Sequence, residues 1–176
     1  MTRSQLEHIL RAAGAITDET ELVILGSQAI LGSNPDAPAE LCASMEADIF
    51  PWGAPEKTDL IDGTLGELSP FHDTHGYYAH GITPDTTVLA EGWRKRLVRI
   101  HSPATHGVVG LCLCPADLAI SKLAAGRDKD FSFVTALLTN RLARGEEIVA
   151  LAGCLPDPVR GVVLSNLRIC LARTAP

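Results

Sequence analysis

The sequence is poor in aromatic residues and in lysine, and it contains no long apolar run. Aromatic residues make up 5% of its 176 residues, and only four of its 15 basic residues are lysine. No apolar stretch approaches the ~20 residues that a membrane-spanning helix needs, and no signal peptide precedes the first predicted helix. We therefore expect a cytoplasmic protein without a membrane partner.

The sequence also contains fewer basic than acidic residues. The 15 basic residues are outnumbered by 21 acidic ones, which gives a formal net charge of −6. Nonspecific binding of duplex nucleic acid usually requires a basic surface, so this balance argues against it. A local basic patch could still bind a nucleotide. The excess of arginine over lysine suits phosphate recognition, although a genome rich in G and C would produce it as well.

The five cysteines form no C-x-x-C pair. They are Cys42, Cys112, Cys114, Cys154 and Cys170. An odd number without metal-ligand spacing argues against a disulfide framework and against a zinc ribbon. We expect reduced thiols, most of them buried.

Length and hydrophobic pattern predict one compact domain of the α/β (α+β) class. A chain of this length with 46% apolar residues can bury a core without a disulfide or a metal. We expect an α/β core over residues 1–114 and a helical region over residues 115–176 that packs on it. Predicted strands are 22–25, 44–50, 77–80, 86–89, 97–101 and 108–112, and predicted helices are 5–13, 27–31, 55–63, 116–125, 130–143, 146–152 and 158–172.

The first and last helices carry signals at their ends. Ser4 and Glu7 have the spacing of a capping box, and the apolar face that follows consists of Leu6, Ile9, Leu10 and Ala13. Asp157 is expected to cap the last helix, with Pro158 in its first position. An apolar stripe along that helix would permit a homodimer; it comprises Val159, Val162, Val163 and Leu167.

The stretch "LVILGSQAILGS" joins a predicted strand to a short helix through Gly26 and Ser27. Backbone N–H groups at such a helix start can bind an anion, and a glycine lets a phosphate approach closely. Turns of this kind are also common as plain connections between a strand and a helix. The stretch alone therefore leaves both interpretations open.

The next predicted strand carries two carboxylates at alternate positions. In "ASMEADIFP", Ser44, Glu46 and Asp48 alternate with apolar residues, so their side chains share one face of the strand. Two neighbouring like charges are costly unless a cation or solvent screens them. In phosphoryl transfer such a pair holds Mg²⁺ against the nucleotide phosphates. The alternative is a solvated acidic face on an edge strand.

Together these two motifs resemble the DNA polymerase β-type nucleotidyltransferase superfamily, in which Gly-Ser precedes an acidic pair on the adjacent strand. The wider set "ILGSQAIL", "SMEADIFP", "LIDGTLGELSPFH", "HGYY", "GW" and "DLAISKLAAGRDKDF" is similar to small bacterial nucleotidyltransferase-like proteins related to the AbiEii toxins. The likeness covers roughly residues 20–140. It implies a mixed β-sheet flanked by helices, and a setting in a toxin–antitoxin or phage-defence system with a possible antitoxin-type partner.

The resemblance also implies a role for each matching residue. Gly26 and Ser27 would bind the triphosphate of an NTP, with Ser44 on the same side. Glu46 and Asp48 would hold Mg²⁺ or Mn²⁺ and act with Lys122 in catalysis. Arg127, Lys129 and Asp130 would lie near the nucleotide. Independently, Lys122 sits in an apolar helix face, where an ammonium needs either an anionic partner or a route to water.

The sequence departs from the superfamily pattern in two ways. Glu46 stands where the first aspartate is usual, and the expected third carboxylate is missing from the strand "RLVRIHS". His101 could serve as the base instead, or the site could lack one. The expected activity is transfer of NMP from an NTP to a hydroxyl of RNA, protein or a small molecule. The alternative is a catalytically impaired nucleotide-binding module or a toxin–antitoxin interaction partner.

A histidine-rich segment, "SPFHDTHGYYAHG", offers a different site. His72, Asp73, His75 and His80 could ligate zinc, but their spacing matches no common zinc pattern. The segment could instead line the substrate cleft and stack on a base, or form a solvated turn. Trp93 and the "RKR" that follows could likewise stack on a base and bind phosphate.

Overall fold

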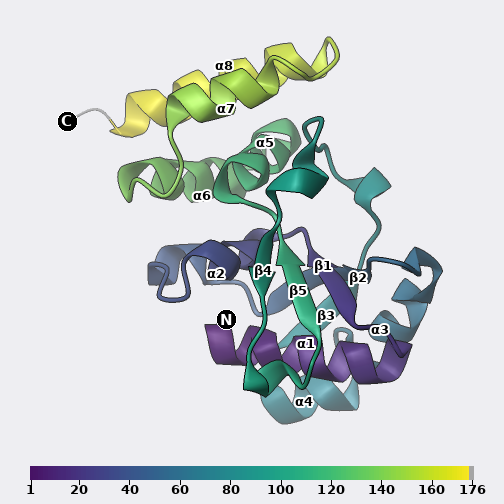
Figure 1. Ribbon diagram of the computed structural model, residues 1–176. Coiled ribbons are helices and arrows are strands. Elements are labelled where there is room, and N and C mark those ends of the chain that lie inside the picture. Colours follow the sequence, from purple (N-terminus) through teal and green to yellow (C-terminus); the bar gives the residue numbers. More distant parts are fainter. Residues whose placement is uncertain (175–176) are drawn as a thin grey trace.

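The computed structural model describes residues 1–174 and places a five-stranded mixed sheet at the centre of the protein (Figure 1). The strands are β1 (Glu21–Ile24), β2 (Glu46–Pro51), β3 (Tyr78–Gly81), β4 (Val98–Ile100) and β5 (Val109–Cys112). Their order across the sheet is β3-β2-β1-β5-β4. The pairs β1–β5 and β2–β3 are parallel, whereas β1–β2 and β4–β5 are antiparallel. The predicted mixed α/β fold is confirmed.

The α-helices flank the sheet and fill the C-terminal third. They are α1 (Arg3–Thr17), α2 (Ile30–Ser33), α3 (Thr58–Leu65), α4 (Pro70–His75), α5 (Pro115–Ala125), α6 (Asp128–Thr139), α7 (Gly145–Ala152) and α8 (Val159–Thr174). The predicted strand at 86–89 is wrong, because this segment leaves a short 3-10 helix at Pro84–Thr86 and enters no sheet. Helix α4 was not predicted; its Ser69 cap accepts a hydrogen bond from the His72 N–H.

Helix α1 packs its apolar stripe across one face of the sheet. The four residues predicted for this stripe, Leu6, Ile9, Leu10 and Ala13, are all fully buried. On β5, a Cβ added at Gly110 would lie 2.7 Å from Leu10 Cδ1, so the missing side chain lets the helix approach. The sheet is therefore covered on this face, and its other face carries Glu46 and Asp48 of β2.

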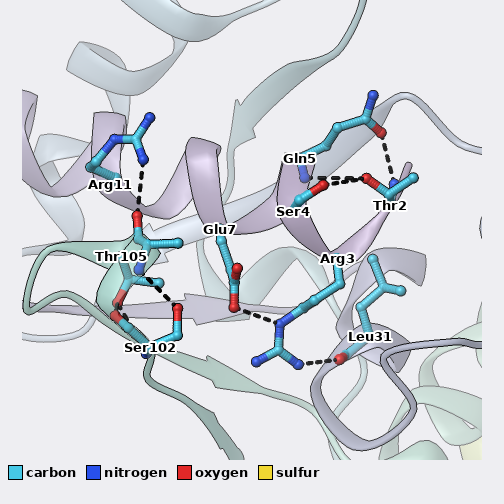
Figure 2. A network of polar contacts seen from close by, with 10 residues as sticks. Thr2, Arg3, Ser4, Gln5, Glu7, Arg11, Leu31, Ser102 and Thr105 are labelled. Atoms are coloured by element: carbon cyan, nitrogen blue, oxygen red, sulfur yellow. Dashed lines mark hydrogen bonds and ion pairs between the residues drawn. The ribbon is translucent and has the colours of Figure 1, made fainter.

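The start of α1 differs from the predicted cap. Thr2, not Ser4, is the N-cap, and it forms a capping box with Gln5. Figure 2 shows the Ser4 hydroxyl against Thr2 instead, while Glu7 pairs with Arg3 at 3.1 Å. Arg3 also donates to the Leu31 carbonyl oxygen at 2.7 Å, which ties α1 to the segment that follows β1.

The C-terminal helices stack on one another beyond one end of the sheet, with α7 and α8 outermost (Figure 1). Helix α8 begins at Val159, one residue after the predicted Pro158, and Asp157 accepts a hydrogen bond from Arg160. Of the predicted apolar stripe, Val163 and Leu167 are buried within the chain. They are therefore not available as a dimer surface.

A buried ion pair fastens the segment before β4 to helix α5. Asp117 is fully buried and accepts two hydrogen bonds from Arg96, both at 2.7 Å. The hydrogen bond to Asp117 raises the pKa of the Arg96 guanidinium. A bidentate pair fixes the relative orientation of both partners. It thus links the helical region to the sheet.

Among residues 1–174, no helix has both the length and the apolar character needed to cross a membrane.

Candidate functional site

A cavity of about 1040 Å³ opens where the sheet meets helices α5 and α6. Its walls come from the end of β1, from β2 and β3, and from the two helices. The residues predicted to bind the cation and the nucleotide all line it: Gly26, Ser27, Ser44, Glu46, Asp48, Lys122, Arg127 and Lys129. Residues more than a hundred positions apart in the sequence, such as Gly26 and Lys129, therefore meet around one space.

The two carboxylates lie on one face of β2 with a histidine beside them. Strand β3 runs parallel to β2 and places His80 directly opposite Asp48. The imidazole Nδ1 lies 2.9 Å from Glu46 Oε1 and 3.3 Å from Asp48 Oδ1. One ligand atom of each side chain lies within 4.8 Å of the other two. Within residues 1–174, this is the one group of three or more such side chains placed to hold a metal ion.

The acidic pair is electrostatically strained without a cation. Burial raises the pKa of Glu46, and the negative charge of Asp48 raises it further. The positive charge of Lys129 acts in the opposite direction, since it favours the carboxylate. The site is therefore built so that added positive charge stabilises it.

The position of the Asp48 carboxylate requires a glycine at residue 26. The Leu25 N–H donates to the Asp48 carbonyl oxygen at 3.0 Å, and this bond brings the β1–helix turn against β2. A Cβ added at residue 26 would lie 1.7 Å from Asp48 Oδ2. The backbone of Gly26 has φ −78°, which any residue can adopt, so the need for glycine is steric. The sequence pattern predicted that this glycine lets a phosphate approach; the structure adds that the missing side chain makes room for the Asp48 carboxylate.

The turn after β1 is a short 3-10 helix, Ser27–Ala29, followed by the four residues of α2. Its Ala29 N–H donates to the Gly26 carbonyl oxygen at 2.9 Å. So short a segment has a weak dipole, because the dipole grows with the number of aligned peptide units. An anion in the cavity would be bound mainly by side chains.

Ser44 supports the carboxylates. Its hydroxyl accepts from the Glu46 N–H at 3.1 Å and donates to the Glu46 carbonyl oxygen at 3.3 Å. Gln28, which is fully buried, donates to the Ser44 carbonyl oxygen at 3.3 Å. Ser44 therefore fixes the start of β2 from the wall of the cavity.

The opposite wall of the cavity is basic and organised by one buried acid. Asp130 is 1% exposed and accepts from Arg127 Nε at 2.6 Å, while Lys122 Nζ lies 3.5 Å from it. Burial alone would raise the pKa of Asp130, but Arg127 and Lys122 together hold it below its usual value. Lys122 also lies over the Phe133 ring, 5.6 Å from its centroid. Lys129 also lines the cavity, so this wall carries three cations and one acid and has an excess of positive charge.

His101 does not belong to the site. It follows β4, which is three strands from β2, or about 14 Å at the usual strand spacing. It is exposed and does not line the cavity. The group beside the acidic pair comes from β3 and is a histidine, not a carboxylate.

The histidines of the histidine-rich segment lie in different surroundings. His72 packs against Tyr78, with ring centroids 4.7 Å apart, and His75 packs against His8 at the same separation. Only His80 of the predicted set reaches the carboxylates, so these four residues form no zinc site. The sequence signal that could have identified His80 was its alternation with Tyr78, which places both side chains on one face of β3.

The five cysteines are free, as the sequence predicted for reduced thiols.

This arrangement of an acidic pair, a serine turn and a basic helix agrees with the comparison of the chain with known families. The family described as "Nucleotidyltransferase of unknown function (DUF6036)" matches residues 4–143. The chain belongs to this nucleotidyltransferase family. The match runs from α1 to the loop between α6 and α7 and includes every residue of the cavity named above. No curated protein and no solved structure matches the chain.

Membership of a nucleotidyltransferase family implies a nucleotide as substrate, and the residues present fit such a ligand. Carboxylate oxygens suit a divalent cation, and the neighbouring basic wall suits phosphate. A donor set of two carboxylates and one imidazole also suits such a cation.

Proposed function

We propose that the protein transfers a nucleoside monophosphate from an NTP to an acceptor hydroxyl, with Mg²⁺ or Mn²⁺ as cofactor. The observation that carries the proposal is the cavity itself, in which an acidic pair faces a basic wall. A triphosphate needs positive charge around its oxygens, and a divalent cation needs the carboxylates. One ligand, an NTP with its cation, meets both requirements.

Glu46 and Asp48 would hold the cation, which neutralises charge on the phosphate oxygens when it is bound. Ser27 would donate its hydroxyl to a phosphate oxygen from the adjacent turn. Arg127 and Lys129 would bind the triphosphate from α6. Lys122 would stabilise the charge that develops on the leaving pyrophosphate. Because Asp130 already holds Lys122 and Arg127, their orientation is set before the nucleotide arrives.

The size of the cavity supports a second ligand beside the nucleotide. Its volume of about 1040 Å³ lies at the upper end of the ~300–1,000 Å³ typical of small-molecule sites. The acceptor would be a hydroxyl of RNA, of a protein or of a small molecule. The likeness of the sequence motifs to AbiEii-related proteins supports a toxin–antitoxin or phage-defence setting for this reaction.

A second candidate is a module that binds a nucleotide without turning it over. Two observations favour it. Glu46 replaces the usual aspartate, which moves the carboxylate by one methylene, and His80 stands beside the pair in place of a carboxylate. Such a protein would act as a nucleotide sensor or as a partner in a toxin–antitoxin pair.

Labelled nucleotides test the proposal. The full chain is incubated with Mn²⁺, with pools of RNA, protein or polyol acceptors, and with NTP labelled at either the α- or the γ-phosphate. Nucleotidyl transfer moves only the α-label to the acceptor, because the γ-phosphate leaves in pyrophosphate. We expect the transfer in the wild type and in His101→Ala, and its loss in Asp48→Asn. Transfer of the γ-label would contradict the proposal, whereas nucleotide binding without transfer to any pool would favour the second candidate.

A further inference from the structure

We propose that His80 is the third protein ligand of the cation, and that this nitrogen ligand makes the site select Mn²⁺ over Mg²⁺. The inference rests on the proposed function, because the cation concerned is the one that would accompany the nucleotide. It goes beyond the acidic pair by assigning an imidazole to the site and by naming the ion that this imidazole favours.

Backbone pairing fixes the position of His80. The parallel register of β2 and β3 sets Glu46 opposite Tyr78 and Asp48 opposite His80, so all four side chains leave the same face of the sheet. Strand β3 is the neighbour of β2 on one side, and β1 is its neighbour on the other. The β1 side is where Gly26 makes room for Asp48. The carboxylate is therefore confined between the turn after β1 and the imidazole on β3.

The distances match those of neighbouring ligands around one ion. Nδ1 of His80 lies 2.9 Å from Glu46 Oε1 and 3.3 Å from Asp48 Oδ1. Adjacent ligands of an octahedral cation with bonds of ~2.1 Å are about 3 Å apart. His80 Nδ1 is also within hydrogen-bonding distance of Asp48 Oδ1. The cation would replace this direct contact between the two side chains.

The environment leaves the imidazole free to ligate. The His80 side chain is 49% exposed, so it reaches the cavity without a large cost of desolvation. The nearby Glu46 and Asp48 side chains are 34% and 25% exposed, so all three are accessible to a solvated ion. His72 packs on Tyr78 and His75 on His8, and neither belongs to the group of ligand atoms that Glu46, Asp48 and His80 form. His80 alone is presented to the carboxylates.

Ligand chemistry determines the preferred ion. Mg²⁺ favours oxygen ligands and retains its waters, so an imidazole ligand adds little to its binding affinity. First-row transition ions bind nitrogen more strongly than Mg²⁺ does, and Mn²⁺ combines this property with a good fit to carboxylate ligands. Two carboxylates with one imidazole therefore favour Mn²⁺ over Mg²⁺.

Electron paramagnetic resonance of Mn²⁺ tests this inference on the full chain without nucleotide. The signal of free Mn²⁺ gives the affinity, and competition with Mg²⁺ gives the selectivity. Electron spin-echo modulation detects a bound imidazole nitrogen directly. We expect wild type to show the nitrogen modulation and to bind Mn²⁺ at least tenfold more tightly than Mg²⁺. His80→Ala should lose the nitrogen modulation. Its Mn²⁺ affinity should fall at least about tenfold, because removal of even an outer-shell partner of a metal ligand usually lowers metal affinity by about this factor.

Two further variants make the result decisive. His101→Ala removes an exposed histidine from the far edge of the same sheet and should behave as wild type. His80→Asp supplies a third carboxylate and should shift the preference toward Mg²⁺. A melting curve without metal checks that each variant folds. Equal Mn²⁺ affinity in wild type and His80→Ala, or a wild-type signal without nitrogen modulation, would overturn the inference.

The outcomes separate this inference from the proposed function. If Mn²⁺ binds through nitrogen but no NTP binds the loaded protein, the proposed function fails while the metal assignment stands. If NTP binds with either ion and His80→Ala changes nothing, the metal assignment fails while the proposed function stands.

Discussion

The Asp48 carboxylate occupies the space that a side chain at residue 26 would need: a Cβ there would lie 1.7 Å from Asp48 Oδ2. Glycine at this turn and aspartate on the neighbouring strand are therefore one structural unit. A change at residue 26 acts on the site through the position of that carboxylate.

Gly26→Ala should displace the Asp48 carboxylate and weaken Mn²⁺ and nucleotide binding as much as Asp48→Asn does. The clash should also cost about 1–3 kcal/mol of stability, as overpacking usually does. Gly63→Ala is the matched control, because nothing lies within 4 Å of a Cβ there. In helix α3 it should raise stability by up to about 1 kcal/mol. Calorimetry and urea unfolding of both variants check this; wild-type metal binding by Gly26→Ala would refute it.

Asp130→Asn should weaken nucleotide binding by releasing Lys122 and Arg127 from their shared partner. The loss of hydrogen bonds to a charged group should also cost about 1–3 kcal/mol of unfolding free energy. The neighbouring Asp128, which is exposed, provides the control variant Asp128→Asn. Titration with NTP and urea unfolding at neutral pH compare the two. Equal affinity in both variants would show that Asp130 does not position the basic wall.

The contribution of Asp130 should depend on pH in a defined direction. Its pKa in the folded protein lies below the ordinary value of 3.8, because Arg127 and Lys122 outweigh the effect of burial. The native state thus binds fewer protons than the unfolded chain around that pH. The stabilisation is complete above pH 3.8 and is lost as pH falls through the folded pKa. The stability difference between wild type and Asp130→Asn should therefore shrink on acidification below pH 4; a growing difference would contradict the assignment.

Arg96→Met should destabilise the protein far more than Arg99→Met. Arg96 is paired with a carboxylate that is 0% exposed, and removing one partner of such a pair costs about 3–5 kcal/mol. Arg99 and Glu21 are 60% and 41% exposed, and such pairs contribute about 1 kcal/mol at most. Urea unfolding of the two variants measures the contrast. Equal losses would mean that the link between α5 and the segment before β4 is not held by this pair.

One cysteine should react much faster than the other four with a thiol reagent at pH 8. Cys154 is exposed. Burial raises the pKa of Cys112 to about 12 and that of Cys114 to about 11, so little thiolate is present at either. Burial also raises the pKa of Cys42 and Cys170. Cys154→Ser should abolish the fast phase; a fast phase that survives would locate the reactive thiol elsewhere.

The sequence was most informative where the structure follows local rules. Period-two alternation placed Glu46 and Asp48 on one face of a strand, and helical periodicity identified the buried stripe of α1. Both patterns depend only on the geometry of a single element. The positions of the Gly26 turn and the Lys122 helix followed from motifs within single segments.

The parts that depend on strand order could not be read from the sequence. His80 joins the carboxylates because β3 pairs in parallel with β2, and nothing local to "YYAH" specifies that neighbour. His101 is distant because β5 lies between β1 and β4. For the space beside Gly26, the sequence suggested only a phosphate. The approach of Asp48 to this glycine could not be predicted, because it depends on contact between two strands.

Calorimetric titration of ATP, CTP, GTP and UTP into the full chain with saturating Mn²⁺ is the most direct test of the central claim. That claim is that the acidic pair and the basic wall bind one NTP together with its cation. We predict that at least one NTP binds, that EDTA abolishes binding, and that Asp48→Asn weakens it at least about tenfold, or 1.4 kcal/mol. His101→Ala should bind as wild type does. Failure of all four nucleotides to bind, or undiminished binding by Asp48→Asn, would contradict the account.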